Sequence, residues 1–127
     1  MIPVAVSARR LAAIGATALA LLFSVVGAVA SAHRSPNSKE AAAISRAVHR
    51  SPARGAVRCF SVRGILVSSA GPWARARIYP CSGRGDDALV VLEHRGGRWT
   101  VRDLGTADTG CSVAPIRVRR DLKLVCA

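Results

Sequence analysis

Apolar and polar residues alternate with two different periods along this chain, after a long uncharged run near its N-terminus. In residues 38–49 the apolar residues recur three and four positions apart, at Ala41, Ile44, Ala47 and Val48. This spacing places side chains on one face of an α-helix. Asn37, with Glu40 three positions later, is typical of a capping box at a helix start. We therefore predict an amphipathic helix over residues 38–49, ended by Pro52.

After the helix the period changes to two, which is typical of half-buried strands. The alternating apolar residues are Phe60, Val62 and Leu66, and then Ala74, Ala76 and Ile78. Folding the chain at the turn between the two runs puts Val62 opposite Ile78 and Leu66 opposite Ala74. The pattern predicts two antiparallel strands that share one apolar face.

The same register sets Cys59 directly opposite Cys81, although only apolar residues define it. Directly opposed strand residues can bring their Cβ atoms within the separation that a disulfide needs. We therefore predict a disulfide between Cys59 and Cys81.

A second hairpin and a short helix follow. Residues 88–93 and 99–104 are strand-like, and Gly96-Gly97 between them supplies the positive φ angles of a tight hairpin turn. Pro115 suits the first position of a helix through residue 122, because its missing amide would be unpaired there. Together the elements predict an α+β fold, with one amphipathic helix on a four-stranded antiparallel meander and a short C-terminal helix.

The N-terminal run has the composition of an export signal. Arg9 and Arg10 precede an uncharged stretch over residues 11–32, which is the order found in a signal peptide. Small residues offer cleavage after Ala32 or, as an alternative, after Ala30. The run also approaches the length of a membrane span, so a domain anchored by an uncleaved signal helix is the alternative to secretion. The paired arginines leave twin-arginine export open beside the general secretory route.

The chain thus divides into a signal peptide over residues 1–32, a flexible tail over 33–37 and one small α+β domain over 38–127. We expect the mature protein to be secreted or extracytoplasmic, where disulfides persist. The cysteines all lie in the domain, at Cys59, Cys81, Cys111 and Cys126. Their even number indicates a disulfide framework, and their spacings lack the close pairs of structural zinc sites. We predict Cys111–Cys126 as the second disulfide, which would hold the C-terminal tail against the domain.

Positive charge dominates the domain. The chain has 19 Lys and Arg against 7 Asp and Glu, and 17 of the basic residues remain after Arg9 and Arg10 leave with the signal segment. Such an excess attracts polyanions, for example envelope phosphates, anionic lipids and acidic glycans. The alternative is that the many arginines reflect genome composition alone.

Five residues of the first hairpin form a candidate anion-binding face. They point away from the predicted core and comprise Arg63, Trp73, Arg75, Arg77 and Tyr79. Guanidinium groups beside aromatic rings can bind an anionic glycan, a lipid headgroup or a single-stranded nucleic acid. The alternative is a solvated face without a ligand, which antiparallel sheets commonly have.

The other polar residues do not indicate catalysis. His33, His49 and His94 fall in a tail, a helix end and a turn, with no orienting partner that would make an acid–base catalyst. We expect no enzymatic activity, no cofactor and no metal site, with one alternative. Cleavage after Ala30 would expose Ser31-Ala32-His33, whose amine, amides and imidazole form a square-planar set that suits Cu(II) or Ni(II).

Several residues in the second half of the domain follow a spacing seen elsewhere. They are Trp73-Ala74, Trp99, Val101, Leu104-Gly105, Cys111, Pro115, Val118, Leu122 and Cys126. This pattern resembles that of small uncharacterised secreted actinobacterial proteins. The resemblance implies a helix followed by a cystatin-like or PepSY-like antiparallel sheet, with a C-terminal disulfide and no established activity.

The sequence as a whole favours a secreted, non-enzymatic module that binds anionic envelope or extracellular polymers through its basic strand face. The expected partner is an anionic cell-envelope polymer, a lipid surface or a secreted protein. The alternative from another class is an inhibitor or regulator of a secreted enzyme, by analogy with cystatin-like architecture, and a small hydrolase ranks last. An exposed apolar wedge near Pro72 would favour the inhibitor, and a deep pocket with convergent polar groups would favour the enzyme.

Overall fold

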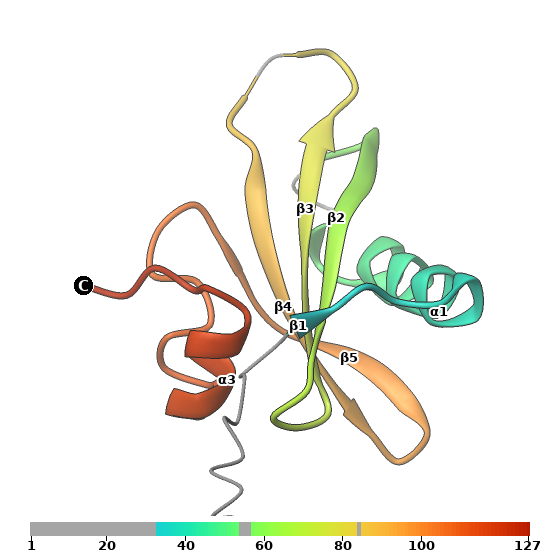
Figure 1. The fold of residues 1–127 in the computed structure, drawn as a ribbon. Coiled ribbons are helices and arrows are strands. Elements are labelled where there is room, and N and C mark those ends of the chain that lie inside the picture. Colours follow the sequence, from blue (N-terminus) through green and yellow to red (C-terminus); the bar gives the residue numbers. More distant parts are fainter. Residues whose placement is uncertain (1–32, 54–56, 84) are drawn as a thin grey trace, which may run out of the picture.

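The computed structural model describes residues 33–53, 57–83 and 85–127. The predicted signal peptide, with both of its cleavage sites, lies outside the described residues. Within the described part, helix α1 (Ser38–Arg50) and the short helix α3 (Ile116–Asp121) lie on opposite sides of one antiparallel sheet (Figure 1). None of the described helices is long and apolar enough to cross a bilayer.

The sheet is a five-stranded meander in which each strand pairs with the next along the chain. Its strands are β1 (His33–Arg34), β2 (Phe60–Ser68), β3 (Trp73–Pro80), β4 (Ala88–Arg95) and β5 (Arg98–Gly105). The prediction of four strands is wrong by one, because β1 pairs with the last two residues of β2. A two-residue strand has no alternation that a sequence pattern could reveal.

Two side chains tie β1 to the rest of the domain, within the segment over residues 33–37 that we expected to be a flexible tail. His33 Nδ1 lies 3.0 Å from the carbonyl oxygen of Asp121. Arg34 donates two hydrogen bonds, each 2.7 Å long, to the carboxylate of Glu40 in α1. These contacts connect β1 to both helices.

The start of α1 has the predicted capping box. Asn37 Oδ1 accepts from the Glu40 amide at 2.8 Å, and the Glu40 carboxylate accepts from the Asn37 amide at 3.2 Å. The helix runs one residue beyond the predicted end, to Arg50. Ile44 and Val48 are fully buried against the sheet, so the predicted apolar face is the one that packs.

The register between β2 and β3 departs from the prediction halfway along the hairpin. Val62 lies opposite Ile78 as predicted, but Leu66 lies opposite Arg75 instead of Ala74. A bulge between Arg63 and Leu66 shifts the pairing by one residue, and Gly64 within it has a φ of +59°. Because side chains alternate along a strand, the extra residue turns Leu66 to the other face of the sheet.

Apolar side chains form a cluster on each face of the sheet. The cluster beneath α1 comprises Ile44, Val48, Ala53, Phe60, Val67, Ala74, Ile78, Val90 and Leu92. The cluster beneath α3 comprises Trp73, Val91, Ala114, Val118 and Leu122, with Leu66 packed against it. The sheet face expected to be solvated is therefore covered at one end by the C-terminal segment.

Both predicted disulfides are present. Cys59 and Cys81 bridge the base of the β2–β3 hairpin, with their Cα atoms 5.4 Å apart. Cys111 and Cys126 join the loop before α3 to the C-terminal tail, with their Cα atoms 5.7 Å apart. Pro115 is the N-cap residue of α3 and not its first helical residue. The helix therefore begins one residue later than predicted.

Candidate functional site

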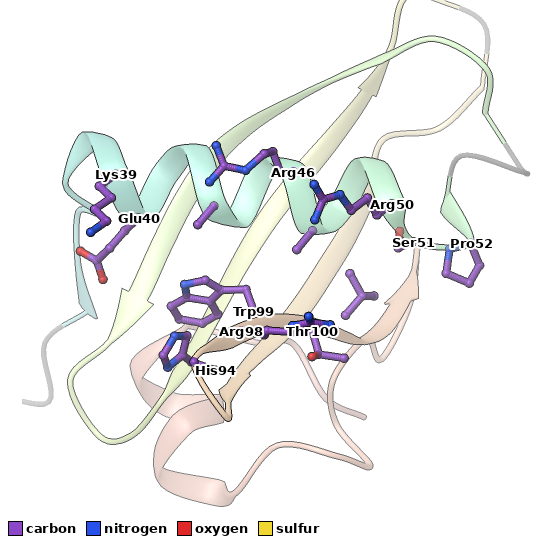
Figure 2. Close-up of a pocket in the computed structure, with 14 residues that line it drawn as sticks. Lys39, Glu40, Arg46, Arg50, Ser51, Pro52, His94, Arg98, Trp99 and Thr100 are labelled. Atoms are coloured by element: carbon purple, nitrogen blue, oxygen red, sulfur yellow. The ribbon is translucent and has the colours of Figure 1, made fainter.

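A groove of about 760 Å³ lies between α1 and the β4–β5 hairpin (Figure 2). Its lining residues that carry a charge or an aromatic ring are Lys39, Glu40, Arg46, Arg50, His94, Arg98 and Trp99. We call this feature the α1–β5 groove. It combines basic side chains of the helix with two rings and a further guanidinium group of the hairpin.

Basic side chains of α1 form a stripe along one edge of the groove. Lys39, Arg46 and Arg50 are exposed and are spaced by seven and four residues, so they share one face of the helix. The buried face carries Ile44 and Val48. Packing of those two residues on the sheet fixes the rotation of α1 and thereby brings the basic stripe to the groove.

Trp99 gives the groove an apolar wall. It pairs with His94 across the hairpin, and the two ring centroids are 5.0 Å apart with planes tilted by 56°. Both rings lie beneath α1 (Figure 2), and the indole also packs against the core. A ring held in this way can contact the apolar side of a flat group while neighbouring guanidinium groups bind its anionic part.

Glu40 is the one carboxylate among the described residues that line the groove, and it already has a cationic partner. The hydrogen bonds from Arg34 lower the pKa of Glu40 to about 2, which outweighs the opposite effect of burial. The carboxylate is therefore ionised at neutral pH and neutralised by a residue outside the groove. Within the described part, no carboxylate pairs with Lys39, Arg46, Arg50 or Arg98.

The residues of the predicted strand face do share one side of the sheet, and three of them gather near its open end. Arg63 lies opposite Arg77 in the β2–β3 register, and both are exposed. The Arg63 guanidinium lies 5.4 Å from the centroid of the Tyr79 ring. This part of the face is basic and open to solvent.

The other two residues of that face, Trp73 and Arg75, contact the C-terminal segment. Trp73 is only 6 % exposed and packs in the cluster beneath α3, so its indole offers little surface to a ligand. Arg75 is half-buried, and its Nη1 donates to the carbonyl oxygen of Lys123 at 3.4 Å. The proposed surface of five residues is therefore divided between a solvated part and a covered part.

The β2–β3 turn offers no apolar wedge in the described structure. Its following residue Trp73 is buried, and the two exposed large apolar side chains among the described residues, Ile116 and Val125, lie elsewhere. The turn is instead bound to α3, because the carboxylate of Asp121 accepts hydrogen bonds from the backbone amides of Ser69 and Ala70.

The histidines are occupied by structural contacts. His49 stacks on Phe60 with ring centroids 4.5 Å apart, and His33 contacts α3 as described above. Residues 31 and 32, which would complete the Cu(II) or Ni(II) alternative, lie outside the described residues. Among those described, no group of three or more His, Cys, Asp or Glu is arranged to hold a metal ion.

Sequence reasoning missed the α1–β5 groove. The polar face of the predicted helix carries Lys39, Arg46 and Arg50, which are exposed in the structure, and Trp99 packs only partly against the core. The signal that was available is the basic stripe at positions 39, 46 and 50. Its significance depends on which hairpin lies beside the helix, and periodicity does not provide that.

The comparisons with known proteins identify no relative. No protein-family model, curated protein or solved structure matches the chain. Of what the resemblance implied, the structure bears out only a helix packed on an antiparallel sheet, and no family is identified.

Proposed function

We propose that this protein is an exported module that binds an anionic polymer of the cell envelope or the extracellular space along the α1–β5 groove. The observation that carries the proposal is a set of four basic side chains beside the ring of Trp99 that have no carboxylate partner among the described residues. They are Lys39, Arg46, Arg50 and Arg98.

The charge arrangement supports an extended ligand over a small one. Lys39 and Arg50 lie eleven residues apart on the helix, which corresponds to roughly 16 Å along its axis at about 1.5 Å per residue. A single carboxylate or phosphate cannot reach both ends of such a stripe, whereas successive anionic groups of a polymer can. Trp99 would orient the polymer by contacting its uncharged parts.

The disulfides support the compartment in the proposal. Cys59–Cys81 and Cys111–Cys126 indicate an oxidising, extracytoplasmic environment. The polyanions of that environment are acidic polysaccharides, phosphate-containing envelope polymers and anionic lipid surfaces. The large positive charge of the chain raises the rate of encounter with each of them.

Binding of the mature, oxidised protein to immobilised polyuronate, with neutral dextran as the reference matrix, tests the proposal. The variant Arg46→Gln/Arg50→Gln removes two charges from the groove. The variant Arg117→Gln/Arg120→Gln removes two charges from exposed positions of α3 and serves as the matched control. Both variants lose the same net charge, so general electrostatic attraction affects them equally.

We expect the groove variant to bind polyuronate at least fivefold more weakly than the control variant, and to elute at lower salt. Binding of neutral dextran should be absent in all cases. Equal weakening in the two variants would mean that net charge alone drives binding, and the groove would then have no specific role.

A further inference from the structure

A second pocket, of about 350 Å³, lies on the face of the sheet opposite α1. Its polar and charged lining residues are Arg75, Arg77, Asp87, Thr106, Asp108, Thr109 and Lys123. Arg75 and Arg77 alternate along β3 with Ala74, Ala76 and Ile78, whose side chains are buried on the α1 side. The pocket is therefore separate from the α1–β5 groove.

The walls of this pocket come from two segments that a disulfide holds together. One wall is the loop after β5, over residues 105–109, and the other is the C-terminal tail at Lys123 and Val125. The Cys111–Cys126 bridge joins the end of that loop to the end of the tail. The bridge thus limits how far the two walls can move apart.

Arg75 brings a charge into the pocket without a counter-ion. Within the described part, no carboxylate lies within ion-pair distance of its guanidinium, and its buried Nε has no hydrogen-bond partner. Asp103 lies in line with Arg75 across the strands, since Val91 lies opposite both residues. Its carboxylate, however, accepts a hydrogen bond from the Gly110 amide at 2.7 Å. Burial, together with the charge of Arg77, lowers the pKa of Arg75, which reflects the same lack of compensation.

Thr109 adds a second unpaired donor. The residue is 4 % exposed, and within the described part its Oγ1 has no hydrogen-bond partner. Buried polar atoms in native structures are nearly always paired, so each exception requires a reason. Two such exceptions, Arg75 and Thr109, line one pocket, and an anion that approaches between them would account for both after small side-chain adjustments.

The charges that line the pocket limit the kind of anion. Arg75, Arg77 and Lys123 contribute three positive charges, and Asp87 and Asp108 contribute two negative ones. Asp108 is also engaged, since its carboxylate accepts from the Ala127 amide at 2.8 Å. The described residues of the lining therefore carry one net positive charge, which matches a singly charged oxyanion better than a dianion.

We propose that the pocket between Arg75, Thr109 and Lys123 binds one singly charged oxyanion, either a carboxylate or a phosphodiester group. The shared chemistry is a compact anionic group with at least two acceptor oxygens. A uronate-containing polymer would supply the first kind of group and a phosphodiester-linked polymer the second. This site lies outside the α1–β5 groove and does not require the function proposed for the groove.

The test is a titration of the mature, oxidised protein with acetate, dimethyl phosphate and inorganic phosphate at pH 8, followed by ¹H–¹⁵N NMR. We expect saturable shifts of the Leu89, Thr109 and Lys123 amides with acetate or dimethyl phosphate, at millimolar concentrations. The probe that binds more tightly indicates whether the natural group is a uronate carboxylate or a phosphodiester. Inorganic phosphate, mostly a dianion at this pH, should bind at least threefold more weakly.

Variants separate this site from general basicity. Arg75→Gln should weaken binding at least tenfold, whereas Arg63→Gln, on the same sheet face but outside the pocket lining, should change it less than twofold. Lys123→Gln is a second pocket variant that leaves β3 unaltered. Dispersed NMR spectra and intact disulfides verify that each variant folds.

Three outcomes would overturn the proposal. They are the absence of saturable shifts with either singly charged probe, equal losses in Arg63→Gln and Arg75→Gln, and unchanged binding in both folded pocket variants. The groove variant Arg46→Gln/Arg50→Gln should retain full binding of the small probes. A failure of the polyuronate experiment would therefore leave this site unaffected, and the reverse also holds.

Discussion

The hydroxyl of Ser68 donates a 2.6 Å hydrogen bond to the carboxylate of Asp121, 53 residues later in the chain. The same carboxylate oxygen accepts from the Ser69 amide at 2.6 Å and from the Ala70 amide at 3.3 Å. Asp121 is the last residue of α3 and is only 1 % exposed. One buried carboxylate thus fastens the C-terminal helix to the turn between β2 and β3.

Asp121→Asn should lower the free energy of unfolding by about 2 kcal/mol, because charge-assisted hydrogen bonds to a buried acceptor are worth about 1.5–3 kcal/mol. The Asn amide group would also present donors to groups that are themselves donors. Urea denaturation at pH 7 measures the change. Asp86→Asn, at an exposed loop position, is the control and should alter stability by less than about 0.5 kcal/mol. Equal effects would contradict a special role for Asp121.

The same residue should make stability depend on pH. Burial acts to raise the pKa of Asp121, but hydrogen bonds from Ser68, Ser69 and Ala70 outweigh it and lower the pKa. The stabilising contribution is therefore fully present above the unfolded value of about 3.9 and is lost as pH falls through the lower folded-state pKa. Thermal unfolding between pH 2 and 6 should show a smaller decline in Asp121→Asn than in the wild type.

Glu40 should titrate at about pH 2, because the two hydrogen bonds from the Arg34 guanidinium stabilise its ionised form. Replacing Arg34 with Gln should raise the pKa of Glu40 toward the usual value of about 4.3. NMR titration of the Glu40 side-chain carbons provides the measurement. Lys39→Gln, one residue away, is the control and should move the pKa much less. An unchanged pKa in Arg34→Gln would mean that the ion pair does not form in solution.

Gly110→Ala should be strongly destabilising, by about 3 kcal/mol. An added Cβ would lie 2.6 Å from Val91 Cγ2 and 2.9 Å from Leu124 Cδ1, and the φ of Gly110 is +82°. Gly97→Ala is the matched control, because Gly97 has a φ of +76° with nothing within 4 Å of its would-be Cβ. It should cost only the conformational strain, about 1–2 kcal/mol. Denaturation of both variants isolates the steric contribution, and equal losses would argue against it.

Removal of the C-terminal disulfide should separate stability from anion binding. Cys111→Ser/Cys126→Ser opens a loop whose ends are 15 residues apart, and we expect a loss of about 3 kcal/mol. Because the bridge limits how far the walls of the pocket beside Arg75 can move apart, the folded variant should also bind acetate and dimethyl phosphate more weakly. Its retention on polyuronate should fall less than that of Arg46→Gln/Arg50→Gln, because the α1–β5 groove is intact. Denaturation, NMR titration and affinity chromatography measure the three quantities.

Local and short-range features were predictable because neighbouring residues determine them. The capping box at Asn37 and Glu40 depends on residues three positions apart, and the apolar face of α1 depends on helical periodicity. The Cys59–Cys81 bridge followed from the hairpin register between the disulfide and Val62, where the pairing has no bulge. Beyond the bulge at Gly64 the same reasoning failed for Leu66.

The candidate sites depended more on tertiary structure. The alternation of β3 correctly placed Arg75 and Arg77 on the face opposite Ala74 and Ala76. It could not indicate that α3 docks on that face and buries Trp73. Nor could it indicate that the basic stripe of α1 borders Trp99, because that contact depends on how a whole helix lies across a sheet.

By itself, the sequence determined the helix, the two hairpins, the Cys59–Cys81 bridge at the base of the first hairpin and the excess of positive charge. These follow from periodicity, opposed positions and composition. Only the tertiary structure decided which basic residues are grouped and which are compensated. The physical reason is that burial and charge pairing depend on distances between segments far apart in the chain. The 53-residue separation between Ser68 and Asp121 is one such case.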